Sequence, residues 1–124
     1  MSISTVLQPL YENRFKVEFL KNEKQLELLT VMVVEATTSI HEKIKAYLTI
    51  EPCLQMGPKL NTLYNNPPFD MKMLGLSEDG NTNTAIVETF TNCKITSLNW
   101  RKDYLSSATM KVYLTLEAEK YTIE

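Results

Sequence analysis

His41 is the only histidine in the 124 residues, so it is the only imidazole available as a catalytic base or a metal ligand. A serine or cysteine nucleophile needs a base within reach, and no nucleophile motif such as G-x-S-x-G surrounds His41. Cys53 and Cys93 lack the C-x-x-C spacing of a zinc site. We therefore expect His41 to be an exposed loop residue and the two cysteines to be free thiols, with one disulfide as the alternative.

The remaining patterns that could carry chemistry are incomplete. Glu117 and Glu119 would lie about 7 Å apart on one strand face, a separation that suits a glycosidase pair. Tyr113 and Thr115 share that face, so a solvated surface is the simpler interpretation. Residues 78–83 lack the ligand spacing of a calcium loop, and the three glycines are too far apart to form a phosphate loop. We expect no enzyme activity, no metal and no cofactor.

Composition narrows the class of protein further. Thirteen basic against fifteen acidic residues give a net charge of -2, which removes the basic face that a general nucleic-acid binder needs. Trp100 beside Arg101 and Lys102 is one aromatic with two cations, and we expect it to cover the core at the end of a strand rather than stack on a base. No apolar stretch approaches a membrane span and no secretory signal is evident. We expect a cytoplasmic site of synthesis and one domain over residues 1–124.

Alternation of apolar and polar residues dominates the chain and predicts strands. Residues 25–38 are expected to form one strand that pairs with the preceding one through a turn at 21–24, although Leu26–Leu29 alone would also suit a helix. An Asp79-Gly80 turn predicts a second hairpin, and the face formed by Val112, Leu114, Leu116 and Ala118 should be buried. The expected strands are 15–19, 25–38, 44–50, 69–73, 85–91, 94–101 and 110–121.

The segment from Cys53 to Pro68 breaks this pattern. It predicts a short, irregular helix or turn that is interrupted by Gly57-Pro58 and ended before Pro67. About seven strands in hairpin order with at most one short helix indicate a mainly β fold, an antiparallel β-sandwich or barrel.

Two regions carry the patterns of a known family. The first is N-x-F-x-V at residues 13–17, followed by a strand that ends in the Thr- and Ala-rich corner 36–38. The second runs from residue 69 to 121 and ends in the V-x-L-x-L strand 112–116. Together they resemble the tail tube proteins of long-tailed bacteriophages, especially those with contractile tails.

This resemblance implies a structural subunit of a virion tail, assembled in the host cytoplasm. Family members form hexameric rings whose strands join across subunits, and the rings stack into a hollow tube that conducts DNA without binding it specifically. The implied partners are further copies of the chain, the tail sheath, the baseplate hub and the neck or terminator proteins. A tube-end adaptor or initiator of the same fold, and a monomeric β-barrel that binds a ligand, remain the alternatives.

A wall that lets DNA slide should be neutral or acidic, because cationic walls would hold the phosphates. On this argument we expect polar residues of the strand faces to line the lumen, with an ordinary solvated outer face as the alternative. The expected lumen residues are Glu18, Glu88, Tyr113, Thr115, Glu117 and Glu119.

Overall fold

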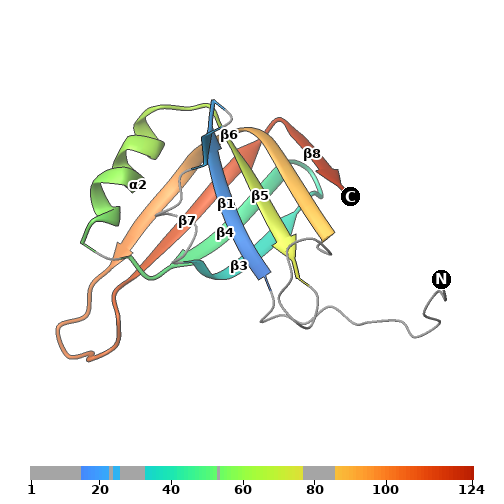
Figure 1. Ribbon diagram of the computed structural model, residues 1–124. Coiled ribbons are helices and arrows are strands. Elements are labelled where there is room, and N and C mark those ends of the chain that lie inside the picture. The colour runs from blue at the N-terminus through green and yellow to red at the C-terminus, as the bar shows by residue number, and fades with distance from the viewer. Residues whose placement is uncertain (1–14, 23, 26–32, 53, 77–85) are drawn as a thin grey trace, which may run out of the picture.

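The computed structural model describes residues 15–22, 24–25, 33–52, 54–76 and 86–124. Within these ranges every strand pairing is antiparallel and a single short helix lies beside the strands (Figure 1). The mainly β fold expected from the sequence is confirmed. The elements are β1 Phe15–Lys21, β2 Lys24–Gln25, β3 Val33–Ser39, β4 Ile44–Ile50, α2 Met56–Asn65, β5 Phe69–Gly75, β6 Ile86–Arg101, β7 Lys111–Ala118 and β8 Lys120–Ile123.

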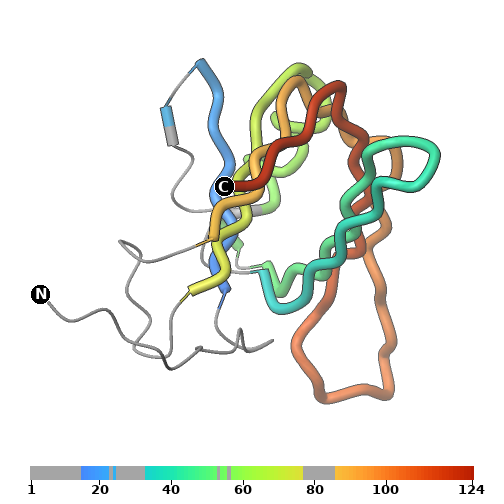
Figure 2. Tube along the Cα trace, turned by 90° about the vertical axis from the view of Figure 1, so that its right-hand side faces the viewer, coloured from blue at the N-terminus to red at the C-terminus, as the bar shows by residue number. Residues whose placement is uncertain are grey.

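The strands form two packed layers that share one long strand (Figure 2). We call the first layer the β5 sheet; it contains β2, β1, β5, the first half of β6 and β8. We call the second the β7 sheet; it contains β3, β4, β7 and the second half of β6. The strand order β2-β1-β5-β6-β7-β4-β3 leaves β2 and β3 at the two ends of the path, so the described strands form an open barrel rather than a closed one.

Strand β6 passes from one sheet to the other at Asn92. This residue has a φ of 54°, in the left-handed region that asparagine tolerates better than most side chains. Its backbone N–H donates to Oδ1 of Asp70 at 3.0 Å, and its side-chain Nδ2 donates to Oε2 of Glu119 at 3.1 Å. The N–H of Glu119 donates to the carbonyl of Thr91 at 3.0 Å. The bend in β6 is thus tied to β5 and to the corner between β7 and β8.

The core lies between the two sheets and follows the predicted alternation. Val112, Leu114 and Leu116 are buried, as expected for the inward face of β7. They meet residues such as Phe19 and Phe90 from the opposite sheet. Burial of these large apolar side chains supplies the main stabilisation of the fold, since each contributes roughly 1.5–3 kcal/mol when removed from water.

Helix α2 closes one side of the sandwich with Leu60 and Leu63, both buried. The expectation that Gly57-Pro58 interrupts this segment is wrong. Both residues lie in the first turn, where the backbone N–H groups have no partner within the helix, so proline costs no hydrogen bond there. The helix ends before Pro67 as expected, and Nδ2 of Asn66 donates to the carbonyl of Thr62.

Three strand predictions need correction. The two described ends of the predicted strand 25–38 pair with different strands: β2 forms the expected tight hairpin with β1, whereas β3 pairs with β4, and residues 26–32 lie outside the described ranges. The segments 85–91 and 94–101 are one bent strand, β6, and the segment 110–121 is divided into β7 and β8. At each bend the inward positions shift by one residue, from Phe90 to Cys93 and from Ala118 to Tyr121, and a shift of this kind does not show from sequence whether a strand bends or ends. The hairpin between β5 and β6 is confirmed by its pairing, while its turn at 78–81 lies outside the described residues.

Replacement of Asn92 by alanine should lower the free energy of unfolding by about 1–2 kcal/mol, because alanine is strained at positive φ. It also removes the hydrogen bond to Glu119. Asn92→Gly removes the same side chain but accepts this φ, and should therefore cost less. Urea unfolding of the three proteins measures the difference; equal losses for both variants would show that the backbone conformation at the bend does not limit stability.

Candidate functional site

The outward face of the β7 sheet collects three of the expected lumen residues. Tyr113, Thr115 and Glu117 alternate along β7 with its buried residues, so their side chains share the outer surface. On β4, Thr49 lies opposite Tyr113, and Tyr47 lies opposite Thr115. Hydroxyl groups and two exposed tyrosines therefore occupy the middle of this face.

The same face carries more cations than carboxylates. Glu117 lies opposite Lys45 on β4 and Lys94 on β6, and its Oε1 is 3.9 Å from the Nζ atoms of both Lys43 and Lys45. This differs from the neutral or acidic wall that the sequence suggested. The strand residues of this face include four cations, Lys45, Lys94, Arg101 and Lys111, and two carboxylates, Glu35 and Glu117.

Glu18 lies apart from this group, on the outer face of the β5 sheet. It follows the buried Val17, lies opposite Lys72 on β5, and its carboxylate is 3.5 Å from Nζ of Lys16. Glu119 lies at the bend between β7 and β8, where it accepts the hydrogen bond from Asn92. The sequence expectation that Glu117 and Glu119 share one strand face is therefore wrong, because β7 ends at Ala118.

Glu88 points to the inner side of the β5 sheet, at the edge of the core. Its Oε2 accepts hydrogen bonds from Oγ1 of Thr38 at 3.0 Å and from the hydroxyl of Tyr121 at 2.6 Å. One carboxylate thus joins β6 to β3 of the other sheet and to β8. Burial, and then the hydrogen bond and negative charge of Glu88, raise the pKa of Tyr121 from 10.0 to about 12.

Two further surface features of the structure were not predicted from the sequence. One is a hollow of about 710 Å³ between β3 and the ends of β1 and β5, whose lining includes Phe15, Val34, Met73 and Glu88. The other is the loop 102–110 between β6 and β7, which projects from the sandwich (Figures 1 and 2). A pair of apolar residues within a polar loop, Tyr104-Leu105, was the available sequence signal for the second feature.

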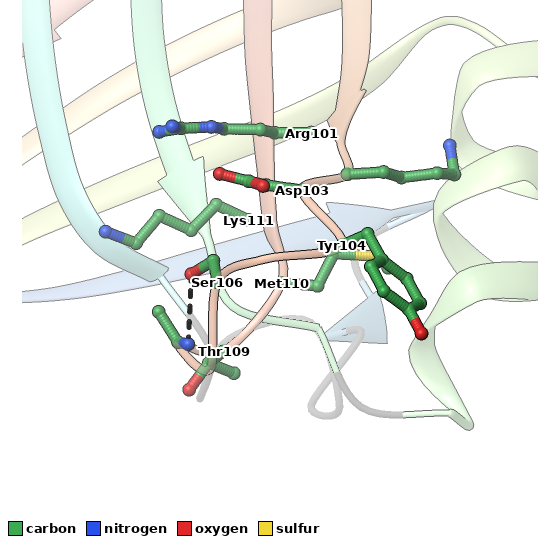
Figure 3. A pocket seen from close by; sticks show the side chains of 9 residues that line it. Arg101, Asp103, Tyr104, Ser106, Thr109, Met110 and Lys111 are labelled. Atoms are coloured by element: carbon green, nitrogen blue, oxygen red, sulfur yellow. Dashed lines mark hydrogen bonds between the residues drawn. The ribbon is translucent and has the colours of Figure 1, made fainter.

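A hollow of about 470 Å³ lies within this loop (Figure 3). Arg101 and Lys111 lie directly opposite each other at its base, and their side chains point to the same side. Tyr104 points to the other side. The loop therefore presents Arg101, Lys111 and the carboxylate of Asp103 on one side and Tyr104 on the other.

The residues first considered for chemistry do not come together. His41 is exposed in the connection between β3 and β4. Cys93 is a free thiol, fully buried, and burial together with the nearby Asp70 charge raises its pKa to about 12, so it is unreactive. Among the described ranges, no three His, Cys, Asp or Glu side chains are close enough to hold a metal ion. No helix in those ranges is long and apolar enough to cross a membrane.

Comparison with known proteins identifies the fold. Neither a family model nor a curated protein matches the sequence. The chain is similar to the tube terminating cap of the anti-feeding prophage, with a TM-score of 0.71 and 18% identity over 99% of this chain and 95% of the cap. It is similar to a chain of the PVC sheath-tube complex, an extracellular contractile injection system, with a TM-score of 0.69, 14% identity and 99% of both chains covered. It is also similar to the sheath/tube terminator of the PVC system, with a TM-score of 0.70 and 15% identity over 97% of this chain and 99% of the terminator.

The chain therefore has the fold of the tube, terminator and cap proteins of contractile injection systems. The resemblance to tail tube proteins that the sequence indicated is confirmed at the level of the fold. These matches cover 97–99% of this chain and 95–99% of the matched chains.

The raised pKa of Tyr121 predicts how stability changes in base. Below pH 10 the phenol is protonated in both states, and its contribution to stability is complete. Between pH 10 and 12 the unfolded chain loses this proton while the folded chain keeps it, so the contribution is lost as the pH rises. Tyr121→Phe should therefore show a shallower fall in the free energy of unfolding between pH 10 and 12. Tyr64→Phe, at an exposed position on α2, is the control and should behave as the parent chain; equal slopes for all three would contradict the prediction.

Proposed function

We propose that this protein is a structural subunit of the tube in a contractile, tail-like injection machine. In this proposal the whole chain is one tube-like domain that forms hexameric rings, and the rings stack into a hollow conduit. The observation that carries the proposal is the likeness to a sheath-tube complex chain over 99% of both lengths.

The open edges of the two sheets support assembly with further copies. Strand β3 is at one end of the strand path, and its outer edge has no partner among the described strands. Such an edge presents free backbone N–H and C=O groups, which favour pairing with another chain. A ring that joins these edges across subunits would satisfy them, as closure does in a barrel.

A position at the end of the tube is the second candidate. The TM-scores to the cap and to the terminator, 0.71 and 0.70, are as high as that to the sheath-tube chain, 0.69. A subunit at the end would share the ring-forming surfaces and present one face that receives no further ring. In either position the proposed partners are further tube subunits, the sheath, the baseplate and the neck or terminator proteins, and the proposed location is the tail of a virion or tail-like particle.

The outer face of the β7 sheet is the proposed wall of the conduit. Tyr113, Thr115 and Glu117 lie together there, whereas Glu18, Glu88 and Glu119 have other positions and are no longer part of this proposal. DNA is the cargo implied by the resemblance to phage tubes. The middle of this face is polar and uncharged, which suits a surface along which a cargo slides, whereas the cations Lys45, Lys94, Arg101 and Lys111 lie toward its two ends and would attract the phosphates of DNA.

The proposal predicts that the purified protein forms rings or stacked tubes with a central hole as its concentration rises. Negative-stain electron microscopy over a concentration series tests this directly. Rings without stacking would favour the tube-end position. A monomer that binds a small ligand at every concentration would instead support the ligand-binding β-barrel.

The wall assignment can be tested by chemical labelling in assembled particles. We expect Tyr113→Cys to react readily with a small maleimide and slowly with a maleimide that carries a long polyethylene glycol chain, since the bore excludes the polymer. Thr122→Cys, on the outer face of the β5 sheet, is the matched control and should react with both reagents. Both variants are made in a Cys53→Ser background, and Cys93 is buried. Equal reaction of Tyr113→Cys with both reagents would place this face outside the bore.

A further inference from the structure

The tip of the β6–β7 loop exposes two large apolar side chains to solvent. Tyr104 is 101% exposed and Leu105 is 91% exposed, so neither packs against its own chain. The turn that carries them is held by hydrogen bonds from the N–H of Leu105 to Oδ1 of Asp103 and from the N–H of Ser106 to the Asp103 carbonyl, each 3.1 Å. The pair is therefore presented in a defined conformation, which lowers the entropic cost of docking.

The base of the loop is cationic. Arg101 and Lys111 lie directly opposite each other across β6 and β7, an arrangement in which like charges repel. Neither forms an ion pair with the residues that the structure describes. The carboxylate of Asp103 points to the same side as both cations without forming an ion pair with either, so the base keeps a net positive charge that a carboxylate of another molecule can still neutralise (Figure 3). The loop thus combines an apolar tip with a base that attracts negative charge.

The hollow beside β3 has the complementary composition. Its walls include the apolar side chains of Phe15, Val34 and Leu74, and its volume of about 710 Å³ is within the range of sites that enclose a small molecule. Its carboxylates are Glu35, which is exposed on the edge strand β3, and Glu88. The receiving surface therefore combines apolar side chains with the hydroxyl groups of Thr37 and Thr38 and with negative charge.

We propose that the β6–β7 loop of one copy docks into the β3 hollow of the next copy. Tyr104 and Leu105 contact the apolar side chains of the hollow, while Arg101 and Lys111 meet the carboxylate of Glu35. This contact deepens the proposed function and rests on it, since it supplies the interface between tube subunits. The two surfaces differ, so each copy both gives a loop and receives one, and the contact propagates into a ring or a filament rather than ending at a dimer.

The first test removes the apolar tip. Tyr104→Ser with Leu105→Ser should raise the protein concentration needed for assembly at least tenfold, measured by sedimentation velocity. The control pair, Ile40→Ser with Leu54→Ser, changes two exposed apolar residues elsewhere on the surface and should assemble as the parent chain does; Leu54 is 93% exposed. An equal loss in both double variants would overturn the contact, as would full assembly of the loop variant.

The second test uses the asymmetry of the contact. The loop variant keeps an intact hollow, and Val34→Lys keeps an intact loop but places a cation in the hollow. Each variant alone should stay monomeric, and an equimolar mixture should form a 1:1 complex that grows no further. Absence of this complex would overturn the contact.

These experiments distinguish failure of the proposed loop–hollow contact from failure of the proposed tube function. Tubes that form normally from the loop variant would overturn the contact and leave the tube function intact. A 1:1 complex between the variants, with no rings or tubes from the parent chain, would support the contact and contradict the tube. A parent chain that stays monomeric at all concentrations would overturn the contact, whereas its capture at the end of a preformed tube would still support the tube-end position.

Discussion

The fold depends on one strand serving two sheets. Strand β6 is 16 residues long, and its halves pair with β5 and β8 on one side of Asn92 and with β7 on the other. A strand can turn this sharply only if one residue leaves the extended conformation and its backbone donor finds a new partner. Asn92 meets the first condition with its positive φ, and Asp70 meets the second by accepting its N–H.

This bend decides which side chains can act together. Because β7 ends where β6 bends, Glu117 stays on the outer face of the β7 sheet and Glu119 becomes part of the corner. The bend also brings β8 back beside the first half of β6, where Tyr121 reaches Glu88. That carboxylate then accepts from Thr38 of the edge strand β3, so the bend, the core and the edge are connected by hydrogen bonds.

The sequence predicts the parts of this fold that depend on local alternation. The buried face of β7 and the pairing of β5 with β6 follow from it, because a half-buried strand must alternate. The bend at Asn92 shifts the buried positions of β6 from Phe90 to Cys93, and such a break in the period of two is equally typical of two separate strands, so the sequence pattern does not distinguish the two cases. Alternation tells which residues share a face of one strand, so it grouped Tyr113 with Glu117 correctly. It does not tell to which sheet a strand belongs, so the expected lumen residues Glu18 and Glu88 lie apart from that group in the structure.

Solvent exposure has different energetic consequences at the proposed conduit wall and at the proposed docking loop. The outer face of the β7 sheet is exposed and polar, so contact with water costs it little and a cargo can pass over it. The pair Tyr104-Leu105 is exposed and apolar, and burying it in another molecule releases free energy of roughly 25 cal/mol for each Å² of apolar area removed from water. The two proposed surfaces overlap at their charged residues, because Arg101, Lys111 and Glu35 belong both to the outer face of the β7 sheet and to the proposed contact. The uncharged middle of the face, which includes Tyr113 and Thr115, is not part of the contact and stays free to meet solvent.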